Sequence, residues 1–85
     1  MMDEKAMRCL VNAYRNASNL DDGLINLGFT TTPCFDIAGD IADAIYYMLG
    51  ENTETFDESV TAQTLWNAEL SNDQCGNILL QHCRR

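Results

Sequence analysis

Apolar side chains along the chain are spaced as in α-helices rather than as in β-strands. They recur every three or four positions through most of the sequence, and no stretch alternates apolar and polar residues as a half-buried strand does. The β-branched cluster at Thr30–Thr32 is short and runs into Pro33. The pattern predicts an all-α fold, a small bundle of four to five helices around a single core, with residues 1–85 forming one helical domain.

Two helices are expected in the first third of the chain. Asp3 is suited to cap a helix whose apolar stripe runs from Met7 to Ala17. Continuing this helix would place Asp21 on the apolar stripe, so we expect a break near Ser18. Ser18 and Asp21 form an S-x-x-D start for a short second helix, which carries Leu20, Leu24 and Leu27 on one side. Gly28 can end that helix in a left-handed conformation, with the following Phe29 available for the accompanying hydrophobic contact.

The third helix has the clearest signals. Thr32 is a candidate N-cap, and Pro33 stands at the first helical position, where its missing N–H is not needed. The helix is expected to end at Gly50. Its apolar stripe is Cys34, Ile37, Ile41, Ile45 and Met48, flanked by Ala38, Ala42 and Leu49. The opposite band is Asp36, Asp40, Asp43 and Tyr47, so this helix is amphipathic with an acidic outer face.

Two capping boxes predict the remaining helices. Thr55 and Glu58 form the first box, and Ser71 and Gln74 form the second. The apolar residues after the first box follow no clean stripe, whereas Cys75, Ile78, Leu79 and His82 share one face of the last helix. The predicted core is Met7, Leu10, Val11, Tyr14, Leu24, Leu27, Phe29, Ile37, Ile41, Ile45, Met48, Val60, Leu65, Trp66, Ile78 and Leu79.

Charge is distributed very unevenly along the chain. The net charge is −8, and all five basic residues lie near the two ends: Lys5, Arg8, Arg15, Arg84 and Arg85. Residues 16–83 contain eleven acidic and no basic residues. Nucleic acids and anionic membranes both bind cationic surfaces, so neither is expected as a direct partner. Ordinary protein surfaces mix the two signs, so this distribution indicates a surface kept negative for a basic protein partner.

The candidate partner surface is the stretch that holds seven of these eleven acids. It joins the outer face of the third helix to the start of the fourth. Its residues are Asp36, Asp40, Asp43, Tyr47, Glu51, Glu54, Asp57 and Glu58. A one-signed surface of this kind accelerates association with a basic partner, and the effect weakens as salt is added.

In size, acidity and helical pattern the chain resembles the small acidic inhibitor proteins of phages and mobile elements, of the anti-restriction and anti-CRISPR type. Many of these inhibitors occupy the nucleic-acid site of a nuclease by presenting carboxylates in place of phosphates. The resemblance implies an inhibitor that binds a basic, nucleic-acid-binding surface of a host protein such as a nuclease.

Catalysis and cofactor binding are not expected. The chain has one histidine, no phosphate-binding loop and no nucleophile motif. The four cysteines contain no C-x-x-C pair, and the first residues show no secretory signal, so we expect a cytoplasmic protein whose thiols are reduced and mostly buried. Two alternatives stay open. One is a helical adaptor or accessory subunit, also as a homodimer, with an apolar contact patch of exposed Trp66 and Tyr46. The other is a thiol metal-binding regulator.

Overall fold

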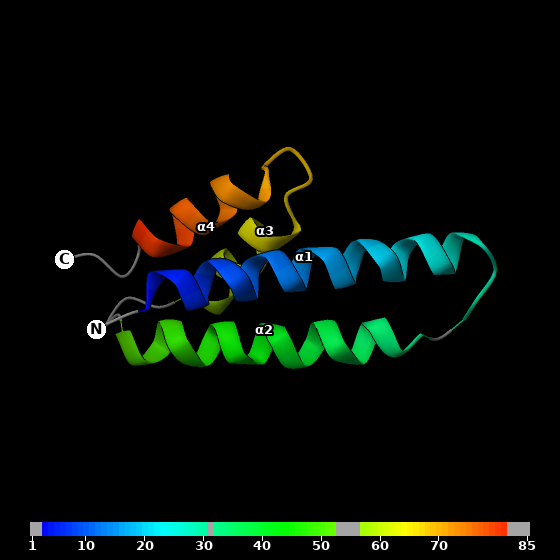
Figure 1. The fold of residues 1–85 in the computed structure, drawn as a ribbon, viewed down its shortest axis with the longest axis horizontal. Helices are drawn as coiled ribbons and strands as arrows, with labels where there is room; N and C mark the ends of the chain where they lie inside the picture. The colour runs from blue at the N-terminus through cyan, green and yellow to red at the C-terminus, as the bar shows by residue number, and fades with distance from the viewer. Residues whose placement is uncertain (1–2, 31, 53–56, 82–85) are drawn as a thin grey trace.

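The computed structural model describes residues 3–30, 32–52 and 57–81, and the regular structure within them is entirely helical. The prediction of an all-α chain is confirmed. The described residues form four helices, which are α1 (Glu4–Asn26), α2 (Pro33–Asn52), α3 (Glu58–Trp66) and α4 (Asn72–Gln81) (Figure 1). None of these helices combines the length and the apolar character needed to cross a bilayer.

Helix α1 is one continuous helix, so the predicted break near Ser18 and the separate short second helix are wrong. Asp3 caps it as predicted, its carboxylate accepting a 3.0 Å hydrogen bond from the backbone N–H of Ala6. The break was expected because Asp21 falls on the buried side. Asp21 is indeed only 8% exposed, but its carboxylate accepts a 2.5 Å hydrogen bond from the hydroxyl of Thr32. This hydrogen bond offsets part of the free-energy cost of burying the carboxylate, so the helix can continue through Asp21.

The end of α1 follows the predicted signal at Gly28. Gly28 has a positive φ of 104°, and its N–H donates to the carbonyl of Ile25 at 2.9 Å. The N–H of Phe29 donates to the carbonyl of Leu24 at 3.2 Å, which completes a Schellman motif. The prediction that Phe29 belongs to the core is wrong, because more than half of its surface is exposed.

Helix α2 begins at Pro33 as predicted, but it passes Gly50 and ends at Asn52. Its most buried line is Ala38, Ala42, Ile45 and Leu49, which were expected to be mainly flanking positions. Ile37, expected in the core, is 51% exposed. The buried line faces α1, which among the described helices is the one that packs extensively on α2, so other sides of α2 are left open.

The starts of the two short helices are set by local side-chain hydrogen bonds. Asp57 caps α3, its carboxylate accepting from the N–H of Val60 at 3.1 Å, and the helix begins at Glu58. Thr55, the first residue of the predicted box, lies outside the described residues. At the start of α4 the predicted box is confirmed. The N–H of Ser71 donates to the side chain of Gln74 at 2.8 Å, and the N–H of Gln74 donates to the Ser71 hydroxyl at 3.1 Å.

Helices α1 and α2 form a long antiparallel hairpin, and the two short helices pack against the N-terminal half of α1 (Figure 1). The molecule measures 45 × 22 × 22 Å. Its buried cluster is Met7, Val11, Tyr14, Ala38, Ala42, Ile45, Leu49, Leu65, Cys75, Leu79 and Leu80. Five predicted core residues are exposed instead: Leu27, Phe29, Ile37, Val60 and Trp66. At 1.5 Å per residue the short helices span only about 15 Å each, too little to cover the hairpin along its length.

Candidate protein-interaction surfaces

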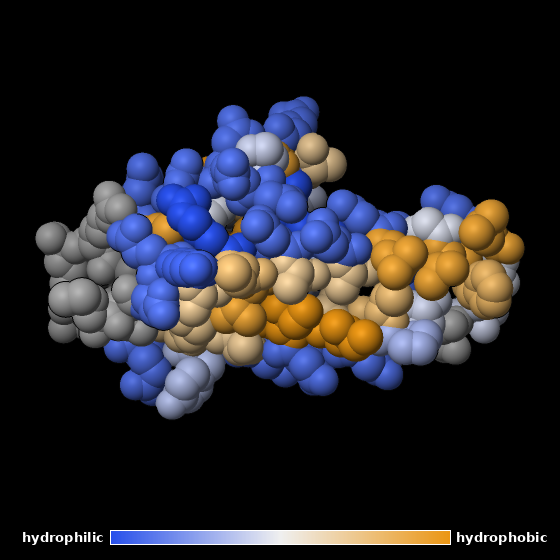
Figure 2. Space-filling view, in the orientation of Figure 1, coloured by the Kyte–Doolittle hydropathy of each residue, from blue (hydrophilic) through white to orange (hydrophobic). Residues whose placement is uncertain are grey.

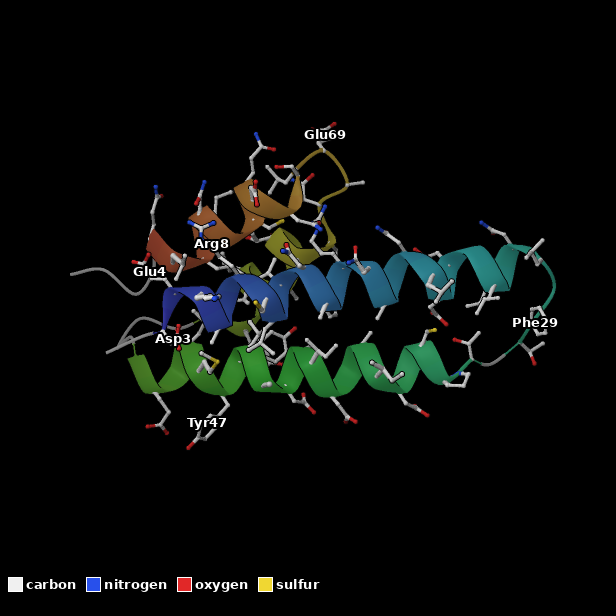
Figure 3. The ribbon with its side chains drawn as sticks, in the orientation of Figure 1. Asp3, Glu4, Arg8, Phe29, Tyr47 and Glu69 are labelled. Carbon is white, nitrogen blue, oxygen red and sulfur yellow. The ribbon has the colours of Figure 1, made fainter. Side chains whose placement is uncertain are left out.

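The first candidate surface is the outer side of α2, which carries the acidic residues that the sequence analysis selected. Four predicted acidic residues and Tyr47 are exposed on this helix, the acids being Asp36, Asp40, Asp43 and Glu51. They lie opposite the line that packs on α1, and Figure 3 shows the ring of Tyr47 directed away from α1. We call these five residues the acidic outer face. Their exposure agrees with the helical wheel, and their role in binding stays a prediction.

The other three predicted residues belong to the next segment of the chain. Asp57 and Glu58 are both exposed at the start of α3, and Glu54 lies outside the described residues. Burial, and then the neighbouring Tyr14, Glu58 and Asp43, raise the pKa of the Tyr46 phenol. Glu58 belongs to α3 and Asp43 to α2, and both raise the pKa of the same phenol.

The second candidate surface is a groove between α1 and α2. Its volume is about 360 Å³, and the residues that line it lie on successive turns of the two helices. Tyr14 and Ser18 contribute from α1, Gly39, Ala42 and Tyr46 from α2, and Trp66 from the end of α3. This groove was not predicted from the sequence. Its only sequence signal is that Phe35, Gly39 and Tyr46 recur at helical spacing beside the buried line of α2.

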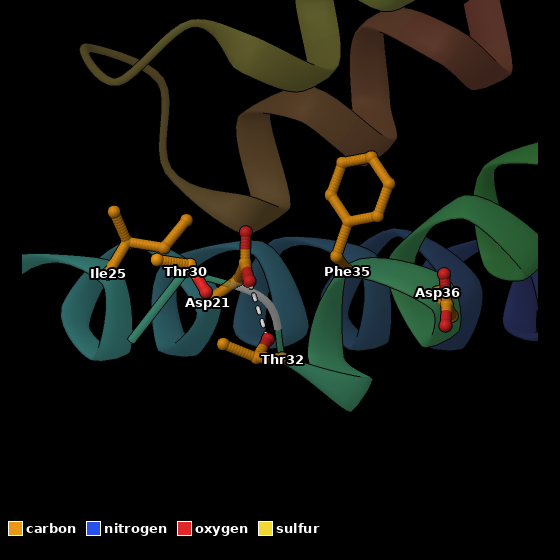
Figure 4. A pocket seen from close by; sticks show the side chains of 6 residues that line it. All are labelled: Asp21, Ile25, Thr30, Thr32, Phe35 and Asp36. Carbon is orange, nitrogen blue, oxygen red and sulfur yellow. Dashed lines mark hydrogen bonds between the residues drawn. The ribbon is translucent and has the colours of Figure 1, made fainter. Parts of the chain in front are cut away.

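The groove continues toward the connection between α1 and α2. A second hollow, also of about 360 Å³, shares Asp21 and Phe35 with the first and extends to Ile25 and Thr30 (Figure 4). The hydrogen bond between Asp21 and Thr32 lies in this second hollow. The two hollows therefore form one concave surface along the hairpin, and we call both together the hairpin groove.

Trp66 lies at one end of the hairpin groove, where a hydrogen bond fixes its position although most of its surface is exposed to solvent. Its indole N–H donates a 2.6 Å hydrogen bond to the hydroxyl of Tyr14, yet 67% of the residue is exposed. Tyr46, the other residue of the predicted apolar patch, is half-buried in the same groove. The structure therefore brings Trp66 and Tyr46 to one concave surface, with Trp66 the more accessible of the two.

A third surface is apolar and surrounds the hairpin end, residues 20–30 and 32–37. Hydrophobic residues gather there and continue as a band along the seam between α1 and α2 (Figure 2). Large exposed apolar side chains of this region are Leu20, Ile25, Leu27, Phe29, Phe35 and Ile37. Contiguous apolar surface of this kind is typical of protein-interaction sites.

The described thiols do not converge on one site. Cys75 is buried, Cys34 is half-buried and Cys9 is exposed, so the prediction of mostly buried thiols is wrong for Cys9. Burial raises the pKa of the Cys75 thiol, and the guanidinium of Arg15 opposes that shift. The other two residues of the metal hypothesis, His82 and Cys83, lie outside the described residues. Within the described part of the chain, no group of three or more His, Cys, Asp or Glu side chains is arranged to hold a metal ion.

Comparisons of the chain with protein-family models, with curated proteins and with solved structures gave no significant match.

Proposed function

We propose that this chain is a non-enzymatic acidic protein-binding module. Its partner would be a basic protein surface, such as the nucleic-acid-binding surface of a nuclease, which the module would inhibit by occupying it. The observation that carries the proposal is the acidic outer face of α2, where four carboxylates and Tyr47 are exposed on one side of one helix. This face lies within a segment of 68 residues that contains no Lys or Arg.

The spacing of the carboxylates on α2 can be compared with the spacing of the phosphates that a basic nucleic-acid-binding surface holds. Asp36 and Asp43 are seven positions apart, which is about 10.5 Å along a helix that rises 1.5 Å per residue. Phosphates along one nucleic-acid strand repeat at about 3.4 Å of helix axis, so this distance corresponds to about three nucleotides. The spacing is compatible with a role as a substitute for a phosphate backbone in a basic channel, although many helices would meet it, so the proposal depends on the exposed charge rather than on this distance.

Charge reversal at matched positions tests the proposal. We expect this protein to be cytoplasmic, so a partner is first captured from the cytoplasm of the native host and then purified. Asp40→Lys and Asp43→Lys are each compared with Glu69→Lys, which makes the same charge change at an exposed position away from α2. We expect the α2 variants to slow association about tenfold at 50 mM salt, with a smaller effect of Glu69→Lys and weaker wild-type binding at 500 mM salt. Equal effects of all three variants would contradict a role for the acidic outer face.

A second candidate function is a helical adaptor or accessory subunit that binds through apolar residues around Trp66. The observation that favours it is the exposure of Trp66 together with the uncovered apolar hairpin end. Light scattering coupled to size exclusion tests the homodimeric form of this candidate, because the monomer has a mass of 9.5 kDa. Metal analysis of the purified protein tests the less favoured thiol metal-binding regulator.

A further inference from the structure

We propose that the hairpin groove is the docking site for one amphipathic helix of the partner, with apolar residues on one face and Lys or Arg on both flanks. The inference rests on the proposed function, because it specifies which element of a basic partner this acidic module receives.

The dimensions of the hairpin groove fit a helix. On α1 its lining runs from Tyr14 to Ile25, and on α2 from Phe35 to Tyr46. Each stretch has twelve residues and rises about 16.5 Å over its eleven steps, which equals about three turns of a docked helix. Binding of an amphipathic helix in an apolar groove is a recurrent mode of recognition, with contacts repeating every three or four residues.

Gly39 lines this groove on the α2 side and leaves it open there. A Cβ atom added at Gly39 would meet nothing within 4 Å, and its backbone does not have a positive φ. Neither packing within the chain nor a turn therefore requires glycine at this helical position, where glycine is less favourable than alanine. Gly23 on α1 is equally open, so what distinguishes Gly39 is its place in the lining of the groove, where the missing side chain leaves room for a docked helix to approach α2.

The charges around the hairpin groove select a cationic occupant. Asp22 and Asp36 line it and are exposed, while Asp43 and Glu58 act on Tyr46 at the other end. None of the described residues that line its two hollows is Lys or Arg. Arg15 lines a neighbouring hollow that shares Ser18, Asp22 and Trp66 with the groove, and its guanidinium there donates to the carbonyls of Leu65 and Leu70. A second copy of this chain would bring its own acidic residues toward these carboxylates, and like charges oppose such contact. A helix with basic flanks places opposite charges on both rims.

A defined peptide and the single tryptophan of the chain provide the test. The probe is a synthetic 14-residue amphipathic helix of leucine and lysine, and its control replaces every lysine with glutamate. Trp66 is the only tryptophan, so its fluorescence reports whether the peptide covers this end of the groove. Gly39→Leu fills the groove, whereas Gly23→Leu adds the same side chain in equally open space on α1, away from the groove lining.

We expect the leucine–lysine peptide to shift the Trp66 emission to shorter wavelength and the leucine–glutamate peptide to have no effect. Gly39→Leu should weaken binding at least tenfold, and Gly23→Leu should leave it unchanged. Loss of peptide affinity to the same degree in both glycine variants, an unchanged Trp66 emission on binding, or no binding at all would overturn the inference. A dimer of the wild-type protein that covers Trp66 would overturn it as well.

The same measurements separate this inference from the proposed function. If Asp40→Lys slows binding of the purified partner while Gly39→Leu does not, the groove assignment fails and the acidic outer face stands. If Gly39→Leu abolishes partner binding and Asp40→Lys has no effect, the groove is supported and the outer face of α2 is not the contact.

Discussion

The guanidinium of Arg15 on α1 donates a 2.8 Å hydrogen bond to the Sγ atom of Cys75, a fully buried residue on α4. The same guanidinium also donates to the backbone carbonyls of Leu65 at 2.9 Å and Leu70 at 2.5 Å. The last carbonyls of a helix lack partners within the helix, and Arg15 supplies one at the end of α3. One cation from α1 thus holds the end of α3, the connection after it and the start of α4 together.

Removing this cation should destabilise the fold. We expect Arg15→Ala to lower the free energy of unfolding by about 2–3 kcal/mol, because it leaves several carbonyl groups without a charged donor. Arg15→Lys should recover part of the loss, since an ammonium makes fewer directed hydrogen bonds. Urea unfolding measures both variants. The control is Arg8→Ala, which removes an exposed 2.6 Å hydrogen bond to Asn77 and should cost less than about 1 kcal/mol. Equal decreases in the free energy of unfolding for Arg15→Ala and Arg8→Ala would mean that the contacts of Arg15 contribute no more than an exposed hydrogen bond.

The hydrogen bond between Asp21 and Thr32 should couple the end of α1 to the start of α2. A double-mutant cycle with Asp21→Ala and Thr32→Ala is expected to give an interaction energy of about 1–2 kcal/mol in urea unfolding. Asp21→Asn retains an oxygen that can accept from the hydroxyl and should be milder than Asp21→Ala. Strict additivity of the two alanine variants would mean that the two side chains contribute independently.

Substitutions on the buried side of α2 should lower the stability of the fold far more than substitutions on the acidic outer face. Ile45 is fully buried, so Ile45→Asp should unfold the domain by burying an unpaired carboxylate. Ile41 is only half-buried beside the open apolar band, and Ile41→Asp should therefore be milder. Asp40→Asn, on the acidic outer face, should change stability by less than about 0.5 kcal/mol. Circular dichroism during thermal unfolding ranks the three variants, and damage from Asp40→Asn comparable to Ile45→Asp would mean that the faces are inverted.

Thiol reactivity should follow the burial of the described cysteines. In the native protein we expect Cys9 to react rapidly with a thiol reagent, Cys34 more slowly, and Cys75 only on unfolding. Burial keeps the Cys75 thiol protonated, and its Sγ donates to the carbonyl of Thr64 at 3.2 Å. Cys9→Ser should remove the rapid phase. Persistence of that phase in Cys9→Ser would assign it to another thiol.

Stability should fall on the alkaline side of neutrality. Burial raises the pKa of Cys75 above its ordinary value of 9.0 and that of Tyr46 above 10.0, so the folded protein holds both protons more tightly than the unfolded chain. Their contribution is complete below these ordinary values and is lost as pH rises through the raised ones. Urea unfolding between pH 7 and 11 should show this decline, with a shallower slope above pH 10 for Tyr46→Phe. An identical slope in that variant would rule out Tyr46 as a contributor.

Local sequence determined where several helices begin and end. The caps at Asp3 and Ser71, the start at Pro33 and the left-handed end at Gly28 were all predicted correctly. Each depends on hydrogen bonds or backbone preferences within a few residues, so the information is contained in a short stretch of chain. The exposure of the acidic outer face was equally predictable, because a carboxylate opposite an apolar stripe has only solvent to face.

Contacts between distant residues decided the rest. Asp21 was expected to break α1, but Thr32, eleven positions away, accommodates it. Arg15 reaches residues 50 to 60 positions along the chain, which no local pattern indicates. The exposure of Ile37 and Trp66, and the existence of the hairpin groove, depend on where two short helices settle against a hairpin much longer than they are. A periodic stripe shows that a side chain prefers burial, but only the packed arrangement shows whether enough protein is present to bury it.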